Sequence, residues 1–577
     1  VYAVGQVIAL ARIVEDRFGN RIDDAQVPVT STPRGGTAVG DGRFRYGADG
    51  RYTLTATVTP PTLDDVPLSA SVEILVDSGG PQIRCDSPAN GAILDQAPGS
   101  SVTFRGSVSD LSGVSNVRVN GVSVAVDGSG NFSRTLTGGF GINFVDVAAT
   151  DGTGRESSRT CAFLLANQWA PTTGTYNDTV SLRLTQTAID DNNRSGSLNS
   201  LSDILNTALN SAGLRNTLHS QLLASNPIKP SSCDQNLCVP IVGCACVLRS
   251  EVIYLNSQLN GPNTASLTLV SGGMRAQVAL NNTRVQLRVR GSVSGIPYDT
   301  TGWVTFSNIT VNATFDIGLS GGRPRITVRA GSVSTSVGSI STSFSGLDGA
   351  IIDIVASIAN GTLRNMVRDL VTNWVRDNFN SILDGVVGNL DIATLGTSFN
   401  VPRLDGSGNI TLSFTPSFSS LSTTSTRALF GIGTRLTAPA AHARPTLGTP
   451  IPSGTVLLDP STTQSTAASV HVGLLGQAVH ALWRGGFFDA TLDSADVSGV
   501  PAGVSARLTT QLPPAVQIRS GRVELALGAV NVLLTYPTLF AQPINAELGA
   551  RASMRVQLVG NDLRFDDVRI DELHFST

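Results

Sequence analysis

Histidine, cysteine and clustered carboxylate side chains are the residues of this chain that could carry chemistry. The five histidines are His219, His442, His471, His480 and His574. No two of them have the HExxH spacing of a helical zinc site, and we identify neither a serine nucleophile elbow nor a GxxxxGK phosphate loop. His480 lies three residues before Trp483, which is typical of a histidine packed in a core. The sequence therefore predicts a protein that is not an enzyme, with no catalytic residue and no cofactor.

Three aspartates, Asp110, Asp127 and Asp151, invite a metal interpretation. Hard cations such as calcium bind clustered carboxylate oxygens. An aspartate in a turn, however, accepts hydrogen bonds from its own backbone a few residues further on. We favour the turn interpretation, and the sequence predicts no metal site.

The six cysteines are an even number in two separated groups, without the spacing of a tetrahedral zinc site. They predict three disulfides, formed by Cys85, Cys161, Cys233, Cys238, Cys244 and Cys246. The four clustered cysteines are expected to hold an insertion at 233–246, and the sequence leaves their pairing open. Disulfides persist in oxidising compartments, so we expect a secreted, periplasmic or cell-surface protein.

Composition places these residues in a long, mostly β chain. The sequence has 577 residues, 59 glycines, 14% charged residues and 5% aromatic residues, which fits several domains built largely of strands. A net charge of −3 provides no strong field for nucleic acid or a membrane surface. No basic segment leads into an apolar run, and no stretch of about 18 uncharged apolar residues occurs. We expect that any signal peptide has been removed and that nothing spans a membrane.

The first 170 residues predict two immunoglobulin-like β-sandwiches, at 1–78 and 79–170. Short alternating strands separated by Gly, Asp and Asn turns are typical of this fold, and the Gly-Gly-Pro at 79–81 marks the hinge between the two. The second module resembles bacterial immunoglobulin-like repeats in five segments: 87–92, 110–114, 119–121, 127–132 and 151–152. Cys85 and Cys161 are expected to join its first and last strands. The resemblance implies spacers or contact surfaces for a protein partner.

One pattern then occurs twice. A strand leads into an amphipathic helix at 180–222, and a shorter version returns at 469–492. Between 266 and 328, apolar and polar residues alternate almost without a break, which predicts a large antiparallel sheet with one apolar face. A helical pattern at 347–387, about 60 Å long if unbroken, is expected to cover that face. Duplication of this unit predicts two helix-containing barrels.

Residues 171–577 resemble the tubular lipid-binding superfamily, which includes bactericidal/permeability-increasing protein. The segments that carry the resemblance are 180–189, 274–328, 347–387, 471–488, 512–514, 551–558 and 563–573. The resemblance implies a mainly β fold with long amphipathic helices, in which two tubular barrels share a central sheet. The expected divisions are a first barrel at 171–394, a central sheet or linker at 395–465 and a second barrel at 466–577.

The resemblance also implies a function, namely an exported lipid-binding or lipid-transfer protein with acyl chains of a phospholipid-like ligand between helices and curved sheets. The residues expected to line these slots are Leu201, Leu205, Leu209, Ile351, Val355, Ile358, Met366, Leu370, Trp374, Leu475, Val479, Leu482, Trp483 and Phe488. The alternative is a cell-surface structural or adhesive protein, in which the same residues form solidly packed cores.

The charge at the tip of the first barrel differs from that of the endotoxin-binding members of the superfamily. They carry many lysines at the tip of the first barrel, whereas the corresponding segment here, 291–302, offers only Asp299. Bactericidal action through lipopolysaccharide is therefore not expected. Two groups of arginines share strand faces, which leaves contact with membrane phosphates open beside ordinary solubility. They are Arg284, Arg288, Arg290, Arg323, Arg325 and Arg329.

Overall fold

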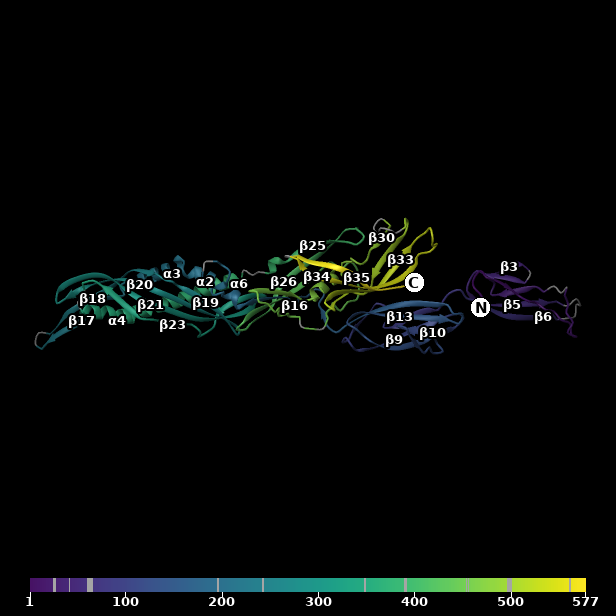
Figure 1. Cartoon of the computed structure of the whole chain (residues 1–577), viewed down its shortest axis with the longest axis horizontal. Coiled ribbons are helices and arrows are strands. Elements are labelled where there is room, and N and C mark those ends of the chain that lie inside the picture. The colour runs from purple at the N-terminus through teal and green to yellow at the C-terminus, as the bar shows by residue number, and fades with distance from the viewer. Residues whose placement is uncertain are drawn as a thin grey trace.

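The computed structural model describes the chain except residues 24–26, 41, 60–65, 195–196, 241–242, 347–348, 389–391, 453, 455, 495–500 and 560–561. The molecule is elongated (Figure 1). The first sandwich lies at one end and a large curled sheet with a long helix lies at the other, with further sheets between them (Figure 1). Most of the chain is β structure, as expected.

The N-terminal region forms two β-sandwiches. The first pairs a sheet of strand order β1-β4-β3 with one of order β2-β5-β6. Its strands are β1 (Val7–Ala9), β2 (Val29–Thr32), β3 (Gly36–Gly40), β4 (Arg43–Tyr46), β5 (Gly50–Val58) and β6 (Leu68–Val76). Tyr46, Tyr52 and Leu54 lie in its core. Because alternate residues of a strand point inward, β4 and β5 bury these residues on one face each.

The second sandwich has a five-stranded sheet of order β11-β10-β13-β14-β8 and a three-stranded sheet of order β12-β9-β7. Its strands are β7 (Gln82–Ser87), β8 (Ala92–Asp95), β9 (Ser101–Ser109), β10 (Val114–Val119), β11 (Val122–Val124), β12 (Asn131–Thr137), β13 (Gly141–Asp151) and β14 (Glu156–Ala166). A disulfide between Cys85 and Cys161 joins β7 to β14, the first and last strands.

A curled sheet follows, built on two very long strands that pair from end to end. They are β20 (Gly273–Val293) and β21 (Ile296–Ser320). The φ of Asn282 is 55°, and around it the buried side chains of β20 change from even positions up to Leu280 to odd positions from Thr283. The other strands of this sheet are β17 (Lys229–Val239), β18 (Gly243–Leu259), β19 (Thr264–Val270), β22 (Arg323–Val328), β23 (Ser334–Val337) and β24 (Ile340–Phe344).

The end of the β17–β18 hairpin contains the four clustered cysteines. Cys233 bonds to Cys246, and Cys238 bonds to Cys244. The two disulfides therefore bridge neighbouring strands of one hairpin. With the bond between the two ends of the second sandwich, all six cysteines are paired, which is typical of a protein that works outside the cytoplasm.

One long helical run covers the curled sheet. It consists of α4 (Gly349–Ile358), a π-helical turn (Ala359–Leu363), α5 (Arg364–Trp374), a second π-helical turn (Val375–Phe379) and α6 (Asn380–Gly388). Apart from Trp374, its buried residues recur every four positions: Ile351, Val355, Ala359, Leu363, Val367, Val371, Val375, Phe379 and Leu383. At 3.6 residues per turn, such a row drifts by about 40° at each step. The two π turns unwind the helix locally and hold this row against the sheet.

This result corrects part of the predicted helix face. The spacing predicts an inner face that contains Ile351, Val355, Trp374 and Phe379, and these residues are buried. The same predicted face also contains Ile354, Ile358, Thr362, Met366 and Leu370, but four of these lie on the flank and Thr362 is exposed. The prediction assumed one regular helix, and the π turns shift the buried row by one residue. The predicted start at residue 347 lies outside the described residues.

The expectation of several long helices is wrong, because only this one is found in the described chain. The first helical segment is divided into α2 (Leu201–Leu209) and α3 (Ala212–Ala224), where the Ser211 hydroxyl caps α3 by accepting a hydrogen bond from Gly213 N. The helix of the second half is α7 (Gly473–Arg484), which ends at Gly485-Gly486. A helix of 12 residues spans about 18 Å and covers only part of a sheet. None of the described helices combines the length and apolar character required to cross a bilayer.

A five-stranded sheet of order β25-β26-β27-β16-β29 lies in the middle of the molecule. Its strands are β16 (Tyr176–Thr185), β25 (Thr397–Pro402), β26 (Asn409–Thr423), β27 (Arg427–Thr437) and β29 (Thr466–Val470). The short helix α1 (Gln186–Ile189) follows β16, a 3₁₀ turn (Ile392–Leu395) precedes β25, and β15 (Trp169–Ala170) pairs with β28 (Thr449–Pro450).

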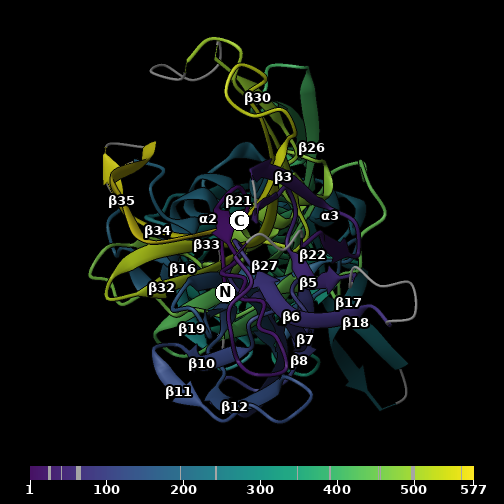
Figure 2. The ribbon, with the colours of Figure 1, turned by 90° about the vertical axis from the view of Figure 1, so that its right-hand side faces the viewer.

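The C-terminal sheet has the order β30-β31-β33-β34-β35, with β32 paired to β33, so β35 is an edge strand. Its strands are β30 (Thr491–Asp493), β31 (Ser505–Thr510), β32 (Ala515–Arg519), β33 (Arg522–Thr535), β34 (Ile544–Val559) and β35 (Asp562–Ser576). Seen from the end of the molecule, β33, β34 and β35 curve away to one side (Figure 2).

The second sandwich packs against the outer face of this C-terminal sheet. Ile142 and Leu164 of the sandwich share a core with Leu512 and Ala526. Phe144 lies against Gly549, where a Cβ atom would come within 2.5 Å of its ring. The absence of a side chain at Gly549 therefore allows the two sheets to approach closely.

We expect Gly549→Val to disturb this contact, because overpacking costs about 1–3 kcal/mol of stability. Gly318→Val in β21 is the control, since a Cβ atom there meets nothing within 4 Å. The measurement is the thermal unfolding midpoint, with limited proteolysis to detect release of the second sandwich. Equal midpoints for the two variants would show that the contact is not close-packed.

Candidate functional site

The residues predicted to line the first slot lie in one continuous core. Leu205, Leu209, Ile351, Val355 and Trp374 are buried in it. They share this cluster with apolar residues of β20 and β21. In the described part of the structure, all five side chains are buried against other apolar side chains.

Four further predicted residues, Leu201, Ile358, Met366 and Leu370, are partly buried and pack against the edge of this core. Three of them lie on the flank of the long helix. They place a half-exposed apolar stripe beside the fully buried row.

Two hollows of the described chain lie away from these nine residues. A hollow of about 610 Å³ lies between the second sandwich and the C-terminal sheet, and it is lined by polar groups such as Arg159 and Glu547, which form an ion pair at 2.7 Å. Another, of about 590 Å³, lies beside Arg290 and Tyr298 near the tip of the curled sheet. Neither has a lining residue from the long helix.

The inner face of the C-terminal sheet is the feature best suited to an apolar ligand. Partners across a pair of strands point to the same face. Between β34 and β35 these partners are Leu548 with Phe575, Ala550 with Leu573, Ala552 with Ile570, and Val556 with Phe565. Every one of these side chains is apolar, so the two strands present one continuous apolar face.

Two irregularities of β35 create this face. The apolar residues Phe565, Ile570, Leu573 and Phe575 are unevenly spaced, which would place some of them on the opposite side of a regular strand. The register with β34 shifts twice, once between Arg551 and Ala552 and once between Ser553 and Arg555. These bulges return each apolar residue to the inner face.

Much of this face is open to solvent. The exposed fractions along β35 are 47% for Phe565, 70% for Ile570, 63% for Leu573 and 57% for Phe575. Contiguous apolar surface of this kind is rare on soluble proteins except where something binds.

Helix α7 covers the opposite end of the same face. Leu475 and Val479, both predicted site residues, pack with Val516, Val523 and Met554 from the sheet. The open part therefore begins beside this helix and extends across β34 to β35.

The remaining predicted residues of the second half face away from this cluster. Leu482 packs with Ile410 and Leu412 of the central sheet. Trp483 is buried, and its indole N–H donates to the Thr510 carbonyl at 3.0 Å. Phe488 is partly buried and makes an edge contact with Phe487. These three residues hold α7 in place and do not line the open face.

His480 is the buried titratable group of this region. Its ring lies 5.5 Å from that of Trp483, and Nε2 is 3.1 Å from the Thr446 hydroxyl. Burial and the nearby Arg484 charge lower the pKa of His480 to about 4. It therefore stays neutral and structural at physiological pH.

The other candidates of the sequence analysis also have structural contacts. Arg288, Arg290, Arg325 and Arg329 each pair with a carboxylate, so the outer strand face carries balanced charge. The sequence does contain one match to the G-x-S-x-G pattern of a nucleophile elbow, at 318–322, which the sequence analysis overlooks. Its serine ends β21 and its glycines turn into β22, so it is not the strand-to-helix elbow of a hydrolase.

Comparison with known proteins supports the sandwich part of the fold. The family model of glucodextranase domain B matches residues 81–167. No curated protein matches the chain. Among solved structures, lipopolysaccharide binding protein is 14% identical over 69% of this chain and 84% of that chain, with a TM-score of 0.37. Fibronectin(III)-like modules of Clostridium thermocellum CbhA are 14% identical over 28% of this chain and 87% of that chain, with a TM-score of 0.15. Likenesses with TM-scores this low assign no family.

Sequence reasoning missed every residue of β35 as a site residue. The segment 563–573 was recognised only as a closing strand. A signal was present, since Phe565, Ile570, Leu573 and Phe575 are four large apolar residues in one strand after the last helical pattern.

We expect His480 to make stability pH-dependent. Folding lowers the pKa of His480 from about 6.5 to about 4. Between these two pH values the His480 side chain is protonated in the unfolded chain and neutral in the folded chain. Stability contributed by the neutral ring is present above pH 6.5 and is lost between pH 6.5 and 4, by about 2 kcal/mol at pH 5.

His480→Gln should remove this component, and His442→Gln, at an exposed histidine, should not. Denaturant unfolding at pH 7.5 and pH 5 measures the difference. The same pH-dependent loss in His480→Gln and in the unmodified chain would contradict the assignment.

Proposed function

We propose that this chain is an exported lipid-binding protein that holds acyl chains on the open inner face of its C-terminal sheet, beside α7. The observation that supports this proposal is the exposure of Phe565, Ile570, Leu573 and Phe575 in one continuous row. We also propose that the chain acts by binding and is not an enzyme.

The size of the face suits such a ligand. At about 3.3 Å per residue, the row from Phe565 to Phe575 is roughly 30 Å long. One layer of acyl chains spans about half of the roughly 30 Å hydrocarbon core of a bilayer. An acyl chain lying along the row gains about 0.8 kcal/mol for each methylene removed from water. A few methylenes in contact with the face thus provide useful affinity.

Charge near the face favours no particular headgroup. Arg569 and Arg522 both pair with Asp567, so basic and acidic groups alternate at the edge. The proposal therefore names acyl lipids as a class and does not extend to lipopolysaccharide.

The first curled sheet is assigned a supporting role. Its predicted slot residues fill a core, whereas those beside the C-terminal sheet, Leu475 and Val479, border the open face. The flank of Ile358, Met366 and Leu370 is the place where a second ligand would enter if the first barrel also binds lipid.

A structural or adhesive protein is the second candidate. The filled first core favours it, and so does β35, because an edge strand can pair with a strand of another chain. In that case a protein partner covers the apolar row, and the two sandwiches provide further contacts.

The first experiment is native mass spectrometry of the purified chain, followed by lipid extraction and vesicle incubation. We expect one added lipid mass per chain. The double variant Ile570→Asp/Leu573→Asp should weaken uptake of a fluorescent fatty acid at least tenfold, because each charged side chain removes apolar contact worth about 1.4 kcal/mol or more.

The matched control is Leu68→Asp in the edge strand β6, whose side chain is also 70% exposed. Ile358→Trp and Leu370→Trp, which block the first barrel, should leave uptake unchanged. Loss of uptake in these two variants alone would move the site to the first barrel. A bare chain that takes up no lipid from vesicles would favour the structural candidate.

A further inference from the structure

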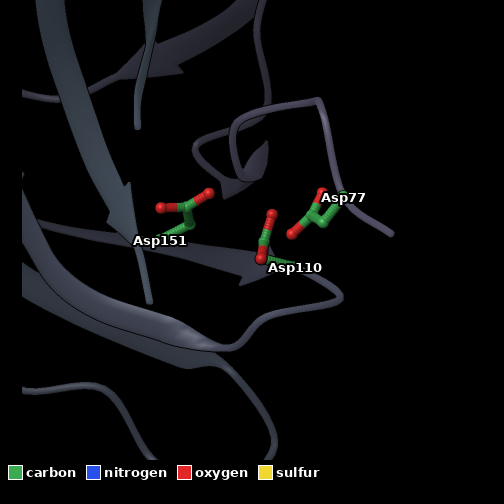
Figure 3. Close-up of side chains that lie close together, drawn as sticks. All are labelled: Asp77, Asp110 and Asp151. Atoms are coloured by element: carbon green, nitrogen blue, oxygen red, sulfur yellow. The ribbon is translucent and has the colours of Figure 1, made fainter. Parts of the chain in front are cut away.

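Three carboxylates meet at the junction of the two sandwiches. Asp77 directly follows β6 of the first sandwich, Asp110 follows β9 of the second, and Asp151 ends β13. One oxygen of each lies within 4.8 Å of an oxygen of the other two. Figure 3 shows the three side chains converging at this point. Segments from both modules therefore contribute to one acidic cluster.

Two of these carboxylates are almost completely removed from water. The exposed fraction is 2% for Asp77 and 1% for Asp151. Like charges that lie close together repel one another, and burial strengthens the repulsion. A positive charge at the cluster comes from Arg155, whose Nη1 lies 3.9 Å from Asp151 Oδ2 and donates to the Asp77 backbone carbonyl. One guanidinium does not balance three carboxylates.

Local hydrogen bonds are made by two members of the cluster. Asp151 Oδ1 accepts from the backbone N–H groups of Thr153 and Arg155, and Asp151 Oδ2 accepts from the Thr153 hydroxyl. Asp110 Oδ1 accepts from the backbone N–H and the hydroxyl of Ser112. The turn interpretation of the sequence analysis thus describes these local contacts correctly.

The position of Asp77 is not explained by hydrogen bonds within a turn. Its Oδ2 atom is buried and lacks a hydrogen-bond partner among the described residues. A buried carboxylate oxygen without a donor is costly and points to a missing ligand. In Figure 3 the Asp77 carboxylate faces Asp110, toward the other two side chains.

Asp127 provides the contrast within the same module. Its Oδ1 accepts from Ser129 N and Asn131 N, and its Oδ2 accepts from the Asn131 side-chain amide. It lies outside the cluster, and both of its oxygens are satisfied locally. Asp127 is therefore a turn aspartate only.

We propose that Asp77, Asp110 and Asp151 bind a calcium ion between the two sandwiches. The donor set consists of carboxylate oxygens, which suit a hard cation. Calcium accepts irregular arrangements of six to eight oxygens, whereas magnesium requires a near-ideal octahedron. A calcium ion supplies the unpartnered Asp77 oxygen with a ligand and offsets the clustered charge.

Such an ion adds a link between two sandwiches that are joined by a short segment and by hydrogen bonds from Arg51 to the Leu111 carbonyl and from Arg155 to the Asp77 carbonyl. Only Ser78, Gly79 and Gly80 separate Asp77 from Pro81, and the second sandwich begins immediately afterwards. Since one ligand belongs to the first sandwich and two belong to the second, binding restricts rotation about this hinge.

The test is calorimetric titration of the chelator-treated full chain with calcium chloride. We expect one ion per chain, with a dissociation constant on the order of 10⁻⁴–10⁻³ M, as in extracellular calcium modules. Asp77→Asn, which keeps the size of the side chain, should weaken binding at least tenfold. Asp127→Asn is the matched control and should bind as the unmodified chain does.

Asp110→Asn is the second variant, because Asp110 is only partly buried and its replacement disturbs folding less. Near-ultraviolet circular dichroism verifies the fold of each variant. Loss of binding in Asp77→Asn and Asp110→Asn, with retention in Asp127→Asn, supports the site. Absence of calcium binding to the full chain, binding that survives both cluster variants, or equal affinity for magnesium overturns the proposal.

Discussion

Each curled sheet of this protein has one apolar face that must be removed from water, and most of the architecture follows from how that face is covered. In the first half, the row from Ile351 to Leu383 lies along β20 and β21 and closes a continuous core. In the second half, α7 is too short to do the same, and its Leu475 and Val479 reach only one end of the sheet. The apolar face of the first curled sheet is thus removed from water, whereas part of the apolar face of the C-terminal sheet stays in contact with it.

The outer face of the C-terminal sheet is covered by the second sandwich and not by a helix. The second sandwich packs on it through Ile142, Phe144 and Leu164, and the interface is fixed by Gly549 and by the ion pair of Arg159 with Glu547. The sheet is therefore supported from outside while its inner face stays accessible.

Local patterns predicted much of this fold. Alternation identified the long strands, and Cys85 and Cys161 indicated which strands begin and end the second sandwich. The buried helix face was only partly predicted, because π turns depend on packing against the sheet and leave no local signature. Asp77 was also missed, since its partners Asp110 and Asp151 are distant in sequence. The open row on β35 depends on bulges and on a missing cover, and neither is visible in a strand considered alone.

The four-residue spacing of the long helix has a consequence for sequence change over time. A one-residue insertion or deletion within 349–388 rotates every later side chain by about 100° and takes the rest of the row off the sheet. Substitutions of similar volume, by contrast, keep the row in place. Descendants of this chain should therefore vary in residue type along this segment while its length stays constant.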